Sequence, residues 1–264
     1  MKPEWQSYDS AAAAHDQLAV PTIFERPARE LVARIGVTAG SIVLDVGTGT
    51  GVAALAAAES AAVVVGLDPS VEMLRKASSH GLACVVAGMV PGLPFAQSTF
   101  DRVIANFVIT HVASYRDSLA DMVRVLKPGG KLGVTAWGSV ENEFRVLWKS
   151  LVGSFVEKDR LAAAVQEALP WEDWFTDPGH LKQALHEAGL AAIHVDRTEY
   201  TTRQTIAEFL ALRENSLQGR FARQVLGADR WEEFRQTMTE EFDRRFKNPI
   251  EYARDFYVAV AQVS

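Results

Sequence analysis

The feature that most constrains this chain is an apolar run that leads into a glycine-rich turn, Val43-Leu44-Asp45-Val46-Gly47-Thr48-Gly49-Thr50-Gly51. The apolar residues predict a buried strand, and the alanine-rich stretch from Val52 predicts a helix. In open α/β sheets, ligands bind at the carboxyl ends of parallel strands, where a glycine turn lets them approach the backbone. The sequence therefore predicts a ligand site at this turn.

A second strand-like run, Val63 to Asp68, ends in an acid. An acid at the end of the second strand is placed to accept hydrogen bonds from the two hydroxyls of a ribose. Together, the glycine turn and Asp68 predict a site for a cofactor that contains a nucleoside. The alternative is an ordinary strand-to-helix turn without a ligand.

The glycine spacing separates two classes of nucleoside cofactor. The dinucleotide pattern G-x-G-x-x-G requires its third glycine where this chain has Val52. Asp45 lies two residues before the first glycine, and a carboxylate there suits a positively charged cofactor with an amino group better than two phosphates. The spacing therefore favours a cationic nucleoside cofactor over a nicotinamide dinucleotide.

Composition and charge restrict the surroundings and partners of the chain. Its 264 residues are 48% hydrophobic, which is enough for a large core, and the net charge of −6 gives no reason to expect a nucleic acid or an anionic membrane as partner. The single cysteine, Cys84, excludes an internal disulfide and a cysteine-cluster metal site. We see no signal peptide and no apolar run of membrane-spanning length, so we expect a cytoplasmic protein without a metal site.

Strand and helix patterns alternate between residues 41 and 137, which predicts a doubly wound, mostly parallel sheet. Strands are expected at 42–46, 63–68, 83–87, 102–107, 131–137, 192–200 and 256–261. Helices are expected at 11–35 with a break at Pro21, at 52–60, 70–79, 114–126, 144–169 and 178–188, and as two or three helices within 206–246.

We interpret the chain as a single domain, residues 1–264. Its expected parts are a helical arm (1–36), a cofactor-binding core (37–140), helices with a sixth strand (141–200), a helical cover over the substrate (201–250) and a last strand (251–264). The helical block before the last strand is too long for a simple connection, so it is expected to cover the ligand-binding edge of the sheet.

Five motifs in this order resemble the class I S-adenosylmethionine-dependent methyltransferases: Val43 to Gly51, Gly66-Leu67-Asp68, Leu93-Pro94-Phe95, Phe100-Asp101-Arg102-Val103 and Arg124-Val125-Leu126-Lys127-Pro128-Gly129-Gly130. The likeness is strongest to the small-molecule branch that includes the ubiquinone and menaquinone biosynthesis enzymes, and it covers residues 40–137. It implies a seven-stranded Rossmann-like sheet with a helical insertion before the last strand. It also implies methyl transfer from S-adenosylmethionine to an O, N or C nucleophile of a small hydrophobic or aromatic metabolite.

The resemblance also implies which residues hold the cofactor: Asp45, Gly47, Thr48, Gly49, Asp68, Pro69, Met73, Gly88, Met89 and Asn106. In this assignment Asp45 orients the cofactor ammonium, Asp68 takes the ribose hydroxyls, and Asn106 contributes its backbone. The chain departs from the family at Met89, where relatives usually carry an acid that accepts the adenine amine.

The sequence offers fewer candidates for residues that bind or activate the substrate than for residues that hold the cofactor. His111 follows the fourth strand, near where the methyl group should emerge, and is a candidate general base. Other candidates for the substrate pocket, besides His111, are Tyr8, His15, Trp137, Trp171 and Trp174. The plainer alternative is that the tryptophans fasten helices to the core and that the histidines, including His80 and His180, lie at the surface.

Three other functions stay open at this point. A cofactor-binding protein without catalysis fits the missing acid at Met89. A nicotinamide-dependent oxidoreductase is opposed by Val52, and a nucleic-acid methyltransferase by the acidic charge balance. We expect a small-molecule acceptor as the partner and a monomer or homodimer.

Overall fold

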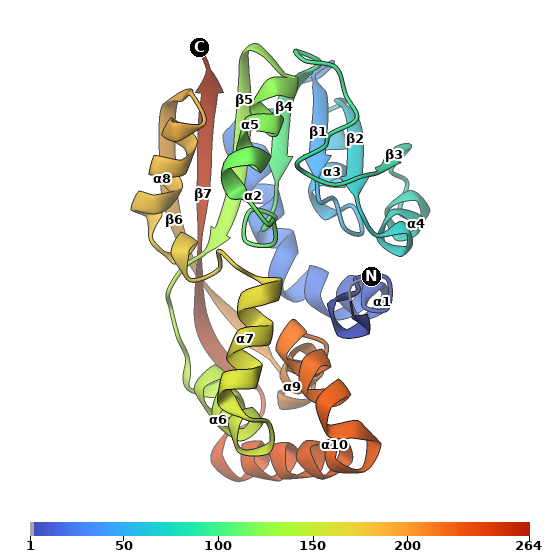
Figure 1. Cartoon of the computed structure of the whole chain (residues 1–264), viewed down its shortest axis with the longest axis vertical. Coiled ribbons are helices and arrows are strands. Elements are labelled where there is room, and N and C mark those ends of the chain that lie inside the picture. The colour runs from blue at the N-terminus through green and yellow to red at the C-terminus, as the bar shows by residue number, and fades with distance from the viewer. Residues whose placement is uncertain (1–2) are drawn as a thin grey trace. The chain divides into compact units, whose positions relative to one another are not determined.

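The computed structural model describes residues 3–264, which form one seven-stranded sheet with the strand order β3-β2-β1-β4-β5-β7-β6 (Figure 1). The strands are β1 (Ile42–Val46), β2 (Val63–Asp68), β3 (Cys84–Ala87), β4 (Phe100–Ala105), β5 (Leu126–Trp137), β6 (Leu190–Gln204) and β7 (Ile250–Val263). The first five pair in parallel, whereas β7 runs antiparallel to β5. The predicted doubly wound, mostly parallel seven-stranded sheet is confirmed.

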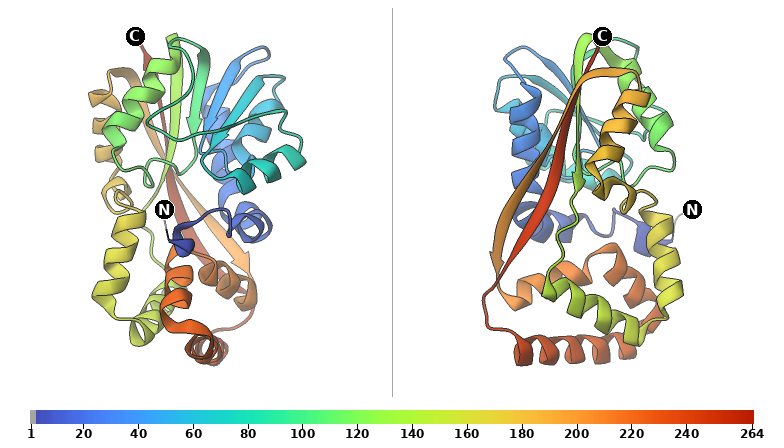
Figure 2. Two further views of the ribbon diagram at one scale, coloured as in Figure 1. Left: turned by 45° about the vertical axis from the view of Figure 1, so that its right-hand side comes forward. Right: turned by 90° about the vertical axis from the view of Figure 1, so that its left-hand side faces the viewer.

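Helices cover both faces of the parallel strands (Figure 2). The helix α2 (Glu25–Ile35) packs with α3 (Val52–Ala58) on one face, and α5 (Tyr115–Val125) packs with α8 (Pro178–Glu187) on the other. The helix α4 (Val71–Ser79) connects β2 to β3, and its N-terminus is capped by the Ser70 hydroxyl, which accepts a hydrogen bond from Met73 N at 3.2 Å. The chain also contains two short 3₁₀ turns, η1 (Glu4–Gln6) and η3 (Trp174–Thr176).

The start of β5 lies earlier than the sequence predicts. Phe100 pairs with Leu126, but Arg102 pairs with Lys131, so four residues of β5 bulge opposite a single residue of β4. The bulge contains Pro128, Gly129 and Gly130, which follow directly after the expected helix 114–126. Opposite the bulge, the carboxylate of Asp101 accepts hydrogen bonds from Ile42 N of β1 and from Lys127 Nζ of the bulge, both at 2.9 Å.

The N-terminal arm corrects our expectation of a break at Pro21. After α1 (Ala12–Ala14), the chain continues as a π-helix, η2 (His15–Phe24), with Pro21 inside it, and then as α2. The wider π-helical turn accommodates a residue that has no N–H to donate, so the helical path is widened and not broken. Such insertions often accompany functional sites.

The described chain divides into two compact units. The first, here called the sheet unit, comprises residues 8–139, 170–198 and 256–264; the second, the helical unit, comprises 3–7, 140–169 and 199–255. The helical unit contains α6 (Glu143–Phe155), α7 (Lys158–Ala168), α9 (Ile206–Glu214) and α10 (Leu217–Arg245) around its own core, which includes Trp148, Phe209, Phe234 and Phe242. The covering role of this block stays a prediction.

No helix within residues 3–264 combines the length and the apolar character that a bilayer crossing requires.

One buried side chain of the helical unit gives a stability prediction. Gln204, at the end of β6, is 6% exposed, and neither its amide oxygen nor its amide nitrogen has a hydrogen-bond partner among the described residues. A buried polar group without a partner costs about 1–3 kcal/mol. We therefore expect Gln204→Met to raise the free energy of unfolding by about 1–3 kcal/mol in urea titrations. Gln236→Met, on the exposed face of α10, is the control; a loss of stability in Gln204→Met would contradict the expectation and indicate an ordered water on the amide.

Candidate functional site

The turn after β1 is a tight loop with three glycines in left-handed conformations that side chains rarely adopt. Gly47, Gly49 and Gly51 have positive φ angles of 64°, 56° and 95°. A Cβ added to Gly47 would lie 2.5 Å from Val108 Cγ2, and one added to Gly51 would lie 3.2 Å from Ala77 Cβ. The N–H of Thr48 donates to the carbonyl oxygen of Leu67 at 2.9 Å, which ties the loop to β2. The loop is therefore fixed in place, and Gly47 and Gly49 are its partly exposed residues.

Asp45 lies beneath this loop and is 1% exposed. Its Oδ2 accepts a hydrogen bond from Thr48 Oγ1 at 2.7 Å, whereas its Oδ1 is buried without a partner among residues 3–264. Burial raises the pKa of Asp45 to about 7; hydrogen bonding from Thr48 and from the backbone N–H of Ala54 opposes the rise, and the charge of Asp68 reinforces it. A buried acceptor without a donor is a position where a positively charged donor from a ligand is strongly stabilised.

Asp68 ends β2, next to the same loop. Its Oδ2 accepts from Gly49 N at 2.9 Å and its Oδ1 accepts from Ser70 N at 2.8 Å. Burial raises the pKa of this carboxyl, and the two backbone donors act against the rise. Each carboxylate oxygen keeps capacity for a further donor. Asp68 thus fixes the glycine loop and can still accept hydrogen bonds from ligand hydroxyls.

The predicted adenine-binding residues lie at the ends of β2 and β3. The N–H of Gly88 donates to the carbonyl oxygen of Asp68 at 3.1 Å, so the two strand ends are joined. Met89 is 63% exposed, Pro69 is exposed, and Met73 is buried. Contact of these residues with a cofactor stays a prediction.

Asp121 and Arg124 of α5 hold the loop that follows Gly88, a role that we did not assign from the sequence. Asp121 Oδ2 accepts from Gly92 N at 2.6 Å and from Leu93 N at 2.8 Å. Arg124 donates to the carbonyl oxygens of Phe95 at 2.7 Å and of Leu93 at 3.0 Å. The two side chains also pair with each other at 2.7 Å. These hydrogen bonds to backbone groups fasten the Leu-Pro-Phe segment to α5.

The ends of β4 and β5 form another side of the site. Thr135 Oγ1 accepts from Phe107 N at 2.8 Å and donates to Asn106 Oδ1 at 2.8 Å. Phe107 is buried with a positive φ of 58°, and its ring stacks on Trp137 with centroids 3.8 Å apart. A bulky residue in this conformation costs about 1–3 kcal/mol, and such strain concentrates at functional sites. The side chain of Asn106 is directed to Thr135, and the predicted contact of its backbone with the cofactor stays a prediction.

The N-terminal arm brings two of the predicted residues to this site. Tyr8 Oη and His111 Nδ1 lie 3.3 Å apart. His15 stacks on Phe24 with centroids 5.0 Å apart, and its Cε1 lies 3.7 Å from the place a Cβ on Gly49 would occupy. The structure therefore places His15 over the glycine loop and pairs Tyr8 with His111.

Two acids fasten the arm to α4. Asp9 Oδ1 accepts from Ser70 Oγ at 2.6 Å and from Glu72 N at 3.2 Å. Asp16 contacts Lys76 Nζ at 3.6 Å and His80 Nε2 at 3.4 Å. His80 is exposed, as expected for a surface residue, but it also takes part in this attachment.

The two loop tryptophans have different surroundings. Trp171 Nε1 donates to the carbonyl oxygen of Val112 at 2.9 Å, and the ring packs edge-on against Tyr115. Trp174 is 42% exposed and stacks on His180 with centroids 3.5 Å apart. These contacts favour the plainer interpretation, in which Trp171 fastens its loop next to His111, and a substrate role for either ring stays a prediction.

Within residues 3–264, no three His, Cys, Asp or Glu side chains are arranged to hold a metal ion.

Comparison with known proteins gives one family and several relatives. Residues 44–134 match the protein family described as "Methyltransferase domain". A demethylmenaquinone methyltransferase of Corynebacterium urealyticum is 38% identical over 106 residues, which are 40% of this chain and 46% of that protein. The chain spans about half the length of the curated relatives that it matches first.

Solved structures show the same fold at low identity. Phosphoethanolamine N-methyltransferase 2 of Haemonchus contortus, in complex with S-adenosyl-L-methionine, is 16% identical, with a TM-score of 0.61 over 100% of this chain and 61% of that one. The [4+2]-cyclase SpnF is 19% identical, with a TM-score of 0.54 over 90% of this chain and 80% of that one. Because a methyltransferase and a cyclase share this fold, the reaction has to be argued from the site.

Proposed function

We propose that this chain, whose residues 44–134 match a methyltransferase domain, transfers the methyl group of S-adenosylmethionine to a small hydrophobic or aromatic metabolite. The observation that carries the proposal is the buried, unpartnered Oδ1 of Asp45 beneath a loop of three glycines, with Asp68 beside it.

The residues of the site fit this cofactor chemically. Bound S-adenosylmethionine would supply a methyl group on a positively charged sulfur. Asp45 offers a buried carboxylate for the ammonium group, and Asp68 offers acceptors for the ribose hydroxyls. Backbone groups of Gly47, Thr48 and Gly49 would hold the methionine part. The adenine would lie among Pro69, Met73, Gly88 and Met89, and Asn106 would contribute its backbone.

The same geometry argues against a nicotinamide dinucleotide. The loop would have to hold two phosphates beside Asp45 and Asp68, which are both buried acids. Like charges at short range in a poorly solvated site repel strongly. The helix α3 also begins at Val52, where the dinucleotide pattern places its third glycine.

For the transfer itself, the chain must orient the acceptor and remove a proton where the acceptor is a hydroxyl, an ammonium or a carbon acid. We assign His111 as the general base. The hydroxyl of Tyr8 lies 3.3 Å from His111 Nδ1 and fixes the orientation of the imidazole ring. Tyr8 is thus a positioning residue in this proposal.

Asp45 should make cofactor binding depend on pH. Its pKa is about 7 in the folded protein against an ordinary value of 3.8, so at pH 6 the folded protein holds a proton that the unfolded chain has released. The stability that this group contributes is therefore present below about pH 4 and is lost as the pH rises towards 7. A bound ammonium favours the ionised carboxylate. We expect the affinity for S-adenosylmethionine to rise by up to about tenfold per pH unit between pH 5 and 7.

Calorimetry in buffers of different ionisation enthalpy measures this coupling. At pH 6 the wild-type protein should release close to one proton per cofactor bound. Because the pKa of Asp68 is raised as well, Asp68 could also release a proton when the cofactor binds. Asp45→Asn separates the two acids, since the proton release should disappear in this variant if it comes from Asp45. An affinity that stays constant from pH 5 to 7 in the wild-type protein would contradict the assignment of Asp45.

The proposed activity is tested by following S-adenosylhomocysteine formation with a panel of acceptors that includes quinones, phenols and amines. Product that forms only when an acceptor is present supports methyl transfer. The second candidate is a cofactor-binding protein without methyl transfer, and the exposed Met89 in place of an acid favours it. Binding of the cofactor without turnover of any of these acceptors would fit this candidate.

A further inference from the structure

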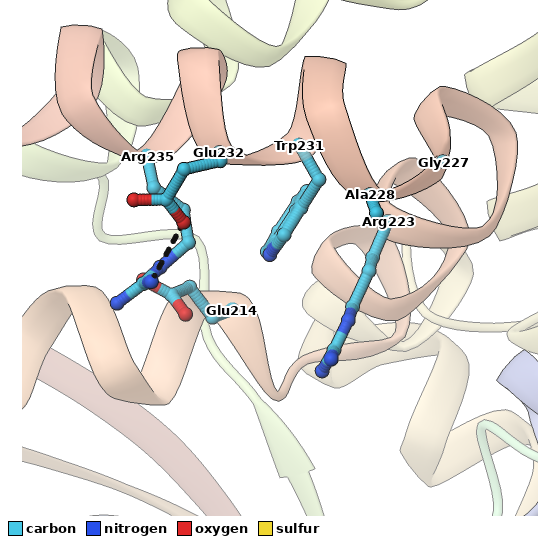
Figure 3. A pocket seen from close by; sticks show the side chains of 7 residues that line it. All are labelled: Glu214, Arg223, Gly227, Ala228, Trp231, Glu232 and Arg235. Carbon is cyan, nitrogen blue, oxygen red and sulfur yellow. Dashed lines mark hydrogen bonds and ion pairs between the residues drawn. The ribbon is translucent and has the colours of Figure 1, made fainter.

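A polar cavity of about 410 Å³ lies in the helical unit, beside a break in α10 (Figure 3). The break is at Gly227, whose φ of 70° and ψ of 178° are not helical, so α10 consists of two consecutive helices. None of the residues lining the cavity belongs to the glycine loop or to the strands around it. The cavity therefore shares no residue with the proposed cofactor site.

One side of the cavity presents hydrogen-bond donors that have no acceptor. Arg223 is exposed and makes no ion pair or hydrogen bond within residues 3–264. Trp231 is 6% exposed as a whole residue; no acceptor for its indole N–H is found among residues 3–264, and this nitrogen is not one of the fully buried atoms without a partner. Figure 3 shows the indole nitrogen pointing in the same direction as the end of Arg223. The second half of α10 begins immediately after Gly227, so the positive end of its dipole lies at the cavity as well.

The opposite side carries two carboxylates that share one guanidinium. Arg235 Nε lies 3.1 Å from Glu214 Oε1, and Arg235 Nη1 lies 3.1 Å from Glu232 Oε2. The hydrogen bond to Glu214 is the main cause of the raised pKa of Arg235. Two carboxylates and one guanidinium leave this side with one net negative charge.

The cavity thus separates one positive charge from one negative charge, with an indole N–H between them. A simple anion would be attracted by Arg223 and repelled by the Glu214–Glu232 side. A simple cation would be attracted by the Glu214–Glu232 side and repelled by Arg223. A ligand that carries both charges at a fixed separation satisfies both sides. We propose that this cavity binds a small amino-carboxylate zwitterion, with its carboxylate on Arg223 and the Trp231 N–H and its ammonium on Glu214 and Glu232.

The probes for a test are the ω-amino acids glycine, β-alanine and 4-aminobutyrate, with acetate and methylammonium as single-charge references. Each is titrated into the full-length protein by calorimetry, without S-adenosylmethionine, so that the result does not depend on the proposed methyl transfer. We expect one of the amino acids to bind at least about tenfold more tightly than acetate or methylammonium, since it gains a second charge-assisted contact.

Three surface variants locate the binding. Arg223→Gln should weaken the best amino acid by about tenfold or more, and Glu214→Gln should reduce its affinity to that of acetate. Arg230→Gln, an exposed arginine of α10 that does not line the cavity, should leave binding unchanged. The proposal is overturned if no amino acid binds, if acetate binds as tightly as the amino acids, or if Arg223→Gln retains wild-type affinity.

Discussion

Replacing His111 by glutamine should lower kcat/KM for methyl transfer by roughly 10²- to 10⁴-fold, the usual contribution of a general base. Glutamine keeps a polar side chain of similar reach beside Tyr8, but it cannot take a proton from the acceptor. Binding of S-adenosylmethionine should stay within about twofold of the wild-type value, because the predicted cofactor contacts lie on the glycine loop and Asp68. Steady-state kinetics and calorimetry on the same preparation measure the two quantities.

The pH–rate profile distinguishes a base from a structural residue. The acidic limb of the wild-type profile should be lost in His111→Gln, and Tyr8→Phe should shift that limb with a smaller loss of rate. His186→Gln, on the exposed side of α8, is the matched control and should leave the profile unchanged. An unchanged kcat/KM in His111→Gln, with an acceptor that must lose a proton, would remove His111 from the mechanism.

Asp68→Ala should weaken S-adenosylmethionine binding by at least about a hundredfold, since two charge-assisted hydrogen bonds of about 1.5–3 kcal/mol each would be lost. The structure adds a second reason, because the same carboxylate holds Gly49 N and Ser70 N in place. Calorimetry measures the affinity, and circular dichroism verifies that the variant is folded. Asp196→Ala, which removes an exposed acid paired with Arg34, controls for the loss of one negative charge. A folded Asp68→Ala protein with affinity within threefold of the wild type would mean that the cofactor does not contact Asp68.

The first two strands were predictable because their signals are local. The bounds of β1 and β2 agree with the predicted 42–46 and 63–68, since apolar runs end in glycines or an acid at the edge of the sheet. Parallel pairing of these strands, with Asp45 opposite Gly66, then brings Asp45 and Asp68 to the same edge. The two most informative acids of the site could therefore be found from spacing alone.

Other parts of the site depend on contacts between distant residues, which leave no periodic signal. Asp121 and Arg124 bind backbone groups 28 to 31 residues away, and no local pattern marks that partnership. The positive φ of Phe107 and the π-helix around Pro21 are local conformations imposed by tertiary packing. Helices in the 206–246 block were expected from the sequence, although α9 is not amphipathic, whereas the cavity at Gly227 depends on how α9 and α10 pack.

Calorimetric titration of the full-length protein with S-adenosylmethionine, and separately with NADH, decides whether the glycine loop with Asp45 and Asp68 holds S-adenosylmethionine. We expect one S-adenosylmethionine site per chain, loss of that binding in Asp68→Ala, and no heat of binding with NADH. A folded protein that binds NADH, or that gives no signal with S-adenosylmethionine at pH 7.5, would contradict this expectation.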